Sequence, residues 1–231
     1  MTYPVGPVEL AGVRNFGWVV PGKLARGEQP PFEAETFAGL RAAGIDTILS
    51  LREDAEKPRT VGQRELPVYS IEHERRMAEE AGLRSLHLPC VDFRAPRPDQ
   101  VRQAMRLLDQ EIGAGRVVMI HCLAGVGRTS ATSAAWYMAH GGSSEIAADR
   151  HMVFMDDAMN RAPSLDKLSE EQMYLRALAH GSAWWGLITI AAALGKPIAP
   201  RKHAPKPVRP PEADGWEAWY ERELAPWRER A

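Results

Sequence analysis

Short apolar runs alternate with longer helical patterns along this chain of 231 residues. The runs are bounded by Gly, Pro or charged residues, as strands usually are. We predict strands at residues 17–20, 23–26, 46–51, 84–88 and 117–121. Strands that alternate with helices are typical of α/β proteins. The pattern therefore predicts a central, mostly parallel sheet flanked by helices.

Helical spacing of apolar residues is clearest between the last two predicted strands. Positions 101, 104, 105, 108 and 112 are apolar, and glycines follow at 113 and 115. This spacing predicts a crossover helix over 98–112. Three further helices are predicted, the first over the helix-prone stretch 130–138, the second over 143–155 and the third over 165–179, where Gly181 is expected to stop it.

Residues 181–231 differ in character from the rest and divide the chain into a domain at 1–180 and an extension. The apolar segment 183–194 has twelve residues, whereas a helix needs about 20 to span a bilayer. We therefore expect no transmembrane span and interpret the segment as a helix docked on the domain. The alternative is a weak membrane or protein contact through this tail. A proline-rich linker at 196–211 and a short aromatic helix at 215–227 are expected to follow.

Composition limits the number of domains, the partners and the cellular compartment that we expect for this chain. A hydrophobic content of 45% in 231 residues suffices for one domain with a sizeable core plus the extension. The net charge of −1 provides no general attraction to nucleic acid. The N-terminal residues lack the apolar stretch of a secretory signal, and two cysteines fit a reducing compartment, so we expect a cytoplasmic protein. No metal-ligand spacing is evident, and we expect neither a metal nor a cofactor.

The candidate chemistry lies in the segment 121–129, His-Cys-Leu-Ala-Gly-Val-Gly-Arg-Thr. It follows a predicted buried strand and opens a predicted helix, so we expect it to form a P-loop whose amides can bind an anion. Cys122 opens the loop at the positive end of the helix, where a thiolate nucleophile is favoured. Arg128 closes it and offers a planar fork for two phosphoryl oxygens. The expected phosphate-binding residues are Leu123, Ala124, Gly125, Val126, Gly127 and Arg128.

This segment resembles the signature of the cysteine-dependent protein tyrosine phosphatase superfamily: His-Cys, five residues, Arg, then Ser or Thr. Stretches at 20–30, 40–53 and 88–92 resemble its compact dual-specificity-like members, so the resemblance covers about the first 180 residues. It implies a hydrolase that acts on a phosphorylated protein or another phosphomonoester through a phosphocysteine. Among its members, tyrosine phosphatases with possible dual specificity are the most similar in the loop.

Two neighbours of the loop have expected supporting roles. Thr129 can donate its hydroxyl to the cysteine sulfur, although a simple helix-opening role is equally compatible with the sequence. His121 leads into the loop from the buried strand, so it is expected to brace the loop by hydrogen bonds rather than to act as the acid.

A general acid is needed to protonate the leaving oxygen. Asp92 follows the strand predicted at 84–88, and ligands in such sheets bind beyond the carboxyl ends of strands. Its loop also resembles the acid-bearing loop of the family, which makes Asp92 the first choice. The rival carboxylates are Asp99, expected to cap the crossover helix, and Asp54, Asp156 and Asp157.

Further assignments depend on the resemblance. Gln172 resembles a glutamine that assists the second step in some relatives, although an ordinary exposed helix residue is the commoner case. Cys90 is interpreted as a core cysteine, and a redox disulfide with Cys122 is the competing interpretation. The loop interior has no lysine, which favours phosphotyrosine over phosphoinositide, while Arg94 and Arg97 beside Asp92 leave a lipid substrate open. Two functions without turnover also stay open: a non-catalytic phosphate-binding module, and an adaptor that works through the tail.

Overall fold

The computed structural model describes residues 6–54, 59–61, 64–66, 69–160 and 170–228. Six strands form the main sheet in the order β1-β2-β3-β8-β4-β7. Strands β3, β8, β4 and β7 run parallel, and β2 and β1 extend the sheet antiparallel. Their bounds are β1 (Val8–Leu10), β2 (Val13–Val20), β3 (Leu24–Gly27), β4 (Thr47–Ser50), β7 (Arg84–His87) and β8 (Val118–His121). The predicted α/β fold with a mostly parallel sheet is confirmed.

Each predicted strand is present, with bounds that differ by a few residues. The prediction missed β1 and a small hairpin formed by β5 (Arg59–Val61) and β6 (Arg64–Leu66). It also started β2 too late, because Arg14 and Asn15 interrupt the apolar pattern there.

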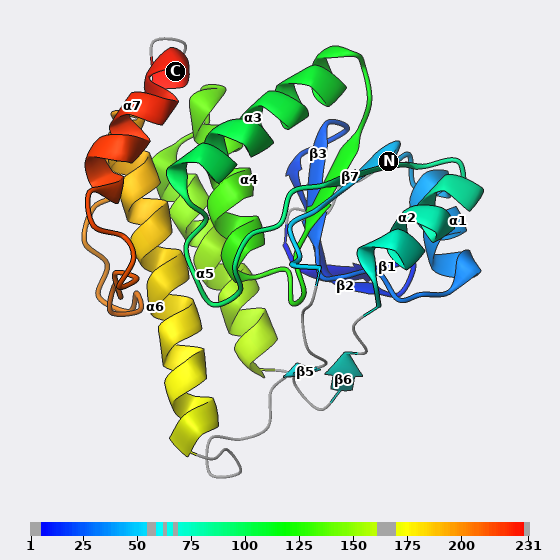
Figure 1. The fold of residues 1–231 in the computed structure, drawn as a ribbon, viewed down its shortest axis with the longest axis horizontal. Coiled ribbons are helices and arrows are strands. Elements are labelled where there is room, and N and C mark those ends of the chain that lie inside the picture. The colour runs from blue at the N-terminus through cyan, green and yellow to red at the C-terminus, as the bar shows by residue number, and fades with distance from the viewer. Residues whose placement is uncertain (1–5, 55–58, 62–63, 67–68, 161–169, 229–231) are drawn as a thin grey trace.

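Helices cover both faces of the sheet (Figure 1). The described helices are α1 (Ala34–Ala42), α2 (Ile71–Glu80), α3 (Pro98–Gly113), α4 (Gly127–Ala139), α5 (Ser144–Asn160), α6 (Glu170–Ala193) and α7 (Trp216–Arg228). Alternate residues of β8 face opposite sides: Met119 belongs to the core shared with α1 and α2, whereas Val118 and Ile120 belong to the core shared with α3 and α4. This two-residue period is what a sheet buried on both faces requires.

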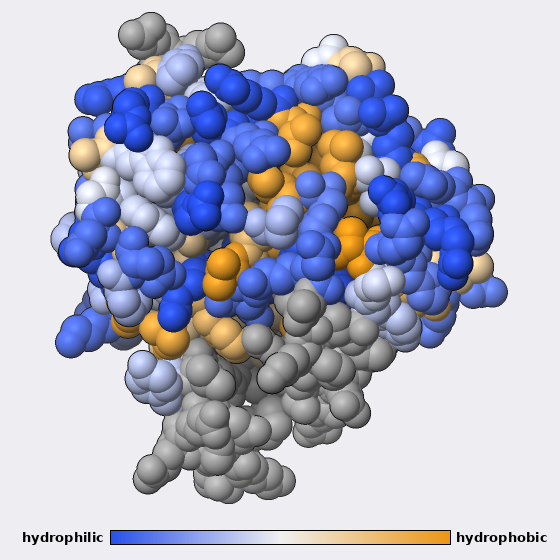
Figure 2. All heavy atoms as spheres, viewed as in Figure 1, coloured by the Kyte–Doolittle hydropathy of each residue, from blue (hydrophilic) through white to orange (hydrophobic). Residues whose placement is uncertain are grey.

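The C-terminal extension belongs to the helical core. Side chains from α6 and α7 share one hydrophobic cluster with α4 and α3, and Trp184, Trp185, Trp216 and Trp227 are all buried in it. The predicted docking of the apolar segment 183–194 is therefore confirmed. The face seen in Figure 2 is largely blue and white over α7, with an orange hydrophobic area beside α3. An outward contact through these four tryptophans is not supported, because their side chains are buried in the core, and Trp219 packs partly buried against the same cluster.

The predicted helix stop at Gly181 is wrong, because α6 continues through this residue to Ala193. A Cβ at Gly181 would lie 2.4 Å from Val208 Cγ2, and Val208 N donates to the Gly181 carbonyl oxygen at 3.0 Å. Glycine at this position thus lets the returning chain pack against α6. The proposed division at residue 180 stays a prediction, and it falls inside α6.

None of the helices within the described ranges is both long and apolar enough to cross a membrane.

Candidate active site

The segment that carries the predicted chemistry joins the central strand to a buried helix. β8 ends at His121 and α4 begins at Gly127, so the loop 122–126 lies at the carboxyl end of the parallel strands. Cys122 is 3% exposed and Arg128 is 2% exposed. The site is therefore built into the core, where electrostatic interactions are stronger than in water.

Four successive carbonyl groups of the loop each have a partner on its outer side. The pairs are Cys122 O with His121 Nδ1 at 3.0 Å, Leu123 O with Gln29 N at 2.9 Å, Ala124 O with Asn15 Nδ2 at 3.1 Å, and Gly125 O with Arg26 Nη2. In a planar trans peptide the next N–H points the opposite way from the carbonyl. The amides of residues 123–126 therefore face the concave side of the loop, as an anion site requires.

Gly125 is the residue of the loop that only glycine suits. Its φ is +69°, and a Cβ would lie 2.4 Å from the carbonyl oxygen of Gly27. The left-handed conformation and the close approach of β3 thus both exclude a side chain. Gly127, by contrast, has its nearest contact at 3.6 Å.

Arg128 and Asp92, which are distant in sequence, are in direct contact. Arg128 Nη2 lies 2.9 Å from Asp92 Oδ1, and Arg128 Nη1 donates to the carbonyl oxygens of Cys90 at 2.9 Å and Leu51 at 3.3 Å. The two carbonyls fix the plane of the guanidinium, and the ion pair brings the predicted acid to the edge of the P-loop.

Asp92 lies on the loop between β7 and α3, as its predicted role requires. Its backbone N–H donates to Glu53 Oε2 at 3.0 Å, and its Oδ1 accepts from Phe93 N at 2.9 Å. Phe93 has φ +58°, a conformation that is unfavourable for a bulky residue. Contacts from outside the loop and a strained residue within it therefore define the carboxylate's position.

The rival carboxylates lie elsewhere. Asp99 pairs with the exposed Arg97 at 2.6 Å, and the N-cap of α3 is Arg97, so the expected cap at Asp99 is wrong. Asp54 is 77% exposed and lies 3.7 Å from His87 Nδ1. Asp156 and Asp157 lie near the end of α5, where the flanking Met155 and Ala158 pack against Val126 of the loop.

His121 belongs to a buried chain of charges that the sequence did not reveal. Its Nε2 lies 3.0 Å from Glu74 Oε1, and Glu74 Oε2 accepts from Arg52 Nη1 at 2.9 Å. Burial alone would raise the pKa of Glu74, but attraction to His121 and Arg52 outweighs it, so that pKa is lowered. The two nitrogens of the His121 ring thus contact Glu74 and the Cys122 carbonyl oxygen at 3.0 Å each, and the ring braces the start of the loop.

Three other predicted residues have less definite positions. The Thr129 hydroxyl is buried and has no hydrogen-bond partner among the described residues, so the expected bond to the cysteine sulfur is not formed. Gln172 belongs to α6, but its side chain lies outside the part of the chain that is described. Cys90 is a free, buried thiol like Cys122, and burial raises the pKa of Cys90 to about 12. Cys90 therefore remains protonated near neutral pH.

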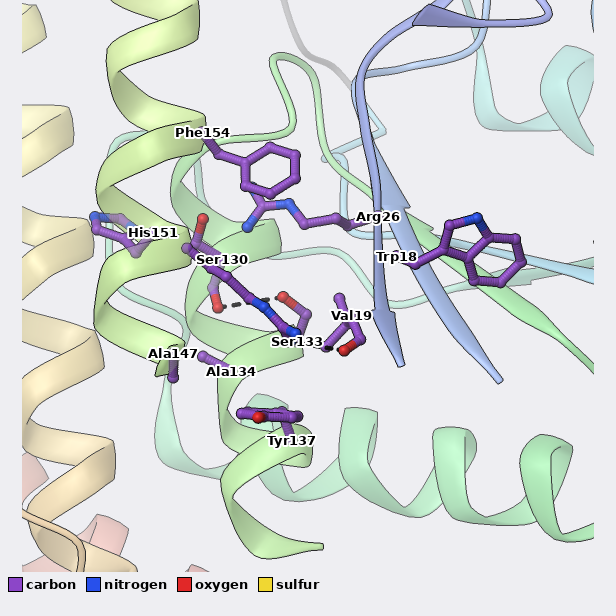
Figure 3. A pocket seen from close by; sticks show the side chains of 11 residues that line it. Trp18, Val19, Arg26, Ser130, Ser133, Ala134, Tyr137, Ala147, His151 and Phe154 are labelled. Atoms are coloured by element: carbon purple, nitrogen blue, oxygen red, sulfur yellow. Dashed lines mark hydrogen bonds between the residues drawn. The ribbon is translucent and has the colours of Figure 1, made fainter. Parts of the chain in front are cut away.

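A small cavity lies between β2, β3, α4 and α5, and both polar side chains, such as Arg26 and Ser130, and apolar ones, such as Phe154, line it. Figure 3 shows Arg26 reaching from β3 toward Phe154 of α5, whose ring centre lies 3.9 Å from Arg26 Cζ. Burial lowers the pKa of Arg26 to about 9, although the proximity of Cys122 acts in the opposite direction. The cavity provides about 10 Å³ for the centre of a water molecule, which is room for one water. Arg26 thus supports the loop from outside through its bond to the Gly125 carbonyl oxygen. The sequence did not indicate this role, because Arg26 is one residue of a predicted strand.

A family model described as "Polymorphic toxin system, DSP-PTPase phosphatase" matches residues 25–142, which include both the P-loop and the Asp92 loop. Among solved structures, a DUF442 protein from Shewanella putrefaciens CN-32 has 20% identity and a TM-score of 0.50, over 81% of this chain and 96% of that chain. This similarity is one of fold. TpbA from P. aeruginosa, solved as a cysteine-to-serine variant with phosphotyrosine, has 21% identity and a TM-score of 0.48, over 78% of this chain and 100% of that chain.

Proposed function

Since the chain belongs to the DSP-PTPase phosphatase family of polymorphic toxin systems, we propose that it hydrolyses phosphomonoesters at Cys122, with phosphotyrosine in proteins as the preferred substrate. The observation that carries this proposal is the joint placement of Cys122, Arg128 and Asp92 around one ring of inward amides.

In the first step the Cys122 thiolate attacks phosphorus in line with the leaving oxygen. An S–P bond forms, the P–O bond to the leaving group breaks, and Asp92 gives its proton to that oxygen. The inward amides and Arg128 hold the equatorial oxygens as charge redistributes. The bound dianion takes over from Asp92 as the partner of Arg128 Nη2, which frees the acid for the leaving group.

In the second step the Asp92 carboxylate accepts a proton from water as that water attacks phosphorus. The S–P bond breaks, inorganic phosphate leaves and the thiolate is regenerated. We retain Gln172 as a candidate helper for this water. Thr129 is retained as a candidate donor to the departing sulfur, because its buried hydroxyl has no other described partner.

The charges around the site support phosphotyrosine over phosphoinositide. The loop interior offers no lysine to a polyphosphorylated headgroup. Of the two arginines beside Asp92, Arg94 pairs with Glu212 at 2.9 Å and Arg97 pairs with Asp99. Both are thus balanced by carboxylates, which reduces their attraction for additional phosphates. We further propose that the enzyme acts in a reducing compartment such as the cytoplasm, where both thiols stay free.

The test is hydrolysis of phosphotyrosine peptides, phosphothreonine peptides and phosphoinositides by the full chain, with Cys122→Ser as the blank. We expect the tyrosine peptides to have the highest kcat/KM. Cys122→Ser should abolish turnover yet still bind the phosphopeptide, because Arg128 and the amides remain. Residual turnover above about a hundredth of wild type would contradict the covalent mechanism, and faster turnover of the lipids would overturn the substrate assignment.

A further inference from the structure

The loop that carries Asp92 is held from two sides. Its first half contacts the end of β4: Cys90 N donates to Leu51 O at 3.2 Å, and Asp92 N donates to Glu53. Its second half, residues 94–96, contacts α6, α7 and the segment before α7.

Residue 95 is fixed by α6. Ser182 Oγ accepts from Ala95 N at 2.8 Å, and both residues are buried. A Cβ at Gly186, one turn further along α6, would lie 2.7 Å from the Ala95 Cβ. Because Gly186 has no side chain, α6 can approach Ala95 more closely than any other residue at this position would permit.

Residues 94 and 96 are fixed by the C-terminal segment. The Tyr220 hydroxyl donates to the Pro96 carbonyl oxygen, and Arg94 Nε pairs with Glu212 at 2.9 Å. Tyr220 is fully buried, and burial raises its pKa well above the usual value, so it remains a donor at physiological pH. Removal of the Tyr220 hydroxyl would leave the buried carbonyl oxygen of Pro96 without this hydrogen bond.

These contacts act on the acid through a short connection. Phe93 lies between Asp92 and the anchored residues and holds a left-handed φ of +58°. A shift of residues 94–96 would let Phe93 relax and would move Asp92 away from Arg128.

We propose that Ser182 and Tyr220, in the C-terminal extension, are positioning residues that hold the Asp92 loop in its proton-donating geometry. This inference rests on the proposed role of Asp92 as the general acid. It assigns the extension a function in the reaction, although the residues matched by the family model end at 142.

The test compares Ser182→Ala and Tyr220→Phe with wild type on two aryl phosphates, one with a poor and one with an activated leaving group. Displacement of the acid should lower kcat about tenfold for the poor leaving group and leave the activated one nearly unchanged. Glu212→Gln, at a half-exposed position that does not endanger folding, should shift kcat in the same direction by a smaller factor.

Matched controls remove groups from the same helices without touching the loop. Thr189→Val deletes a hydroxyl that donates to Trp185 O within α6, and Trp227→Phe deletes a bond from α7 to Asp109. Both should keep the wild-type ratio of the two rates.

The same variants are then made with Asp92→Asn, where no acid is left to position. In the Asp92→Asn background, Ser182→Ala and Tyr220→Phe should not lower kcat further for the substrate with the poor leaving group. Equal losses on both substrates, or a further loss beside Asp92→Asn, would overturn the proposal. If Asp92→Asn itself were insensitive to the leaving group, the assignment of the acid would fail instead.

Discussion

Asp92 and Asp99 flank the same loop but pair with different arginines, the buried Arg128 and the exposed Arg97. We predict that Asp92→Asn lowers kcat by roughly 10²-fold or more on poor leaving groups, the effect usual for a positioned general acid. Asp99→Asn removes an exposed ion pair at the first turn of α3, so it should cost about 1 kcal/mol or less in stability and leave kcat unchanged. Steady-state kinetics and urea unfolding of both variants measure these effects. Loss of kcat in Asp99→Asn alone would require the acid to be reassigned.

Glu74 is predicted to make stability pH-dependent. Its pKa is lowered in the folded protein, so its contribution is complete above the ordinary value near 4.5 and is lost as pH falls through the lowered value. Glu74→Gln removes the carboxylate charge that the buried Arg52 and His121 both contact and should cost about 3–5 kcal/mol at neutral pH. The difference from wild type should shrink below pH 4.5 in urea unfolding at a series of pH values.

The control for Glu74 is Glu72 on the same helix, whose side chain is 75% exposed in its pair with Arg75. Glu72→Gln should unfold like wild type at each pH. A difference for Glu74→Gln that stayed constant down to about pH 3 would show that folding does not lower the pKa of Glu74.

At the scale of elements, the P-loop depends on close contact with β3. Gly125→Ala places a methyl group against the Gly27 carbonyl at a φ of +69°, whereas Gly115→Ala meets a similar φ of +78° in open space. The conformational cost should be about 1–2 kcal/mol in both. Only Gly125→Ala should also distort the loop, so we predict a large loss of kcat and phosphate affinity there and normal kinetics for Gly115→Ala. Similar kinetics in both variants would contradict the proposed contact.

Elements that depend on contiguous sequence could be predicted, and those that depend on distant contacts could not. The strand, the loop and α4 follow one another, so the pattern around Cys122 was sufficient to predict them. Helix α2 was not predicted and Glu74 was not singled out, because its partners Arg52 and His121 are distant in sequence and are brought to it only by the sheet. Gly181 resembled a helix stop because nothing local indicates that Val208 returns to pack against it.

For the whole molecule, we expect the extension 181–231 to unfold together with the rest, because the two share a hydrophobic cluster. Leu187 of α6 is fully buried in the cluster that α3, α4 and α7 share. We predict that Leu187→Ala lowers the free energy of unfolding by about 2–5 kcal/mol, the usual range for a cavity of this kind. Ile188→Ala, at a partly buried neighbouring position, should cost less.

Because the extension and the phosphatase core share this cluster, unfolding should remain one transition in both variants. Tryptophan fluorescence reports largely on the extension, which contains five of the seven tryptophans, whereas activity reports on the P-loop. The urea midpoints of fluorescence, circular dichroism and activity should coincide and move together in Leu187→Ala. A fluorescence transition that shifted while the activity transition stayed in place would mean that the extension folds as a separate unit, and it could not then hold the Asp92 loop as proposed.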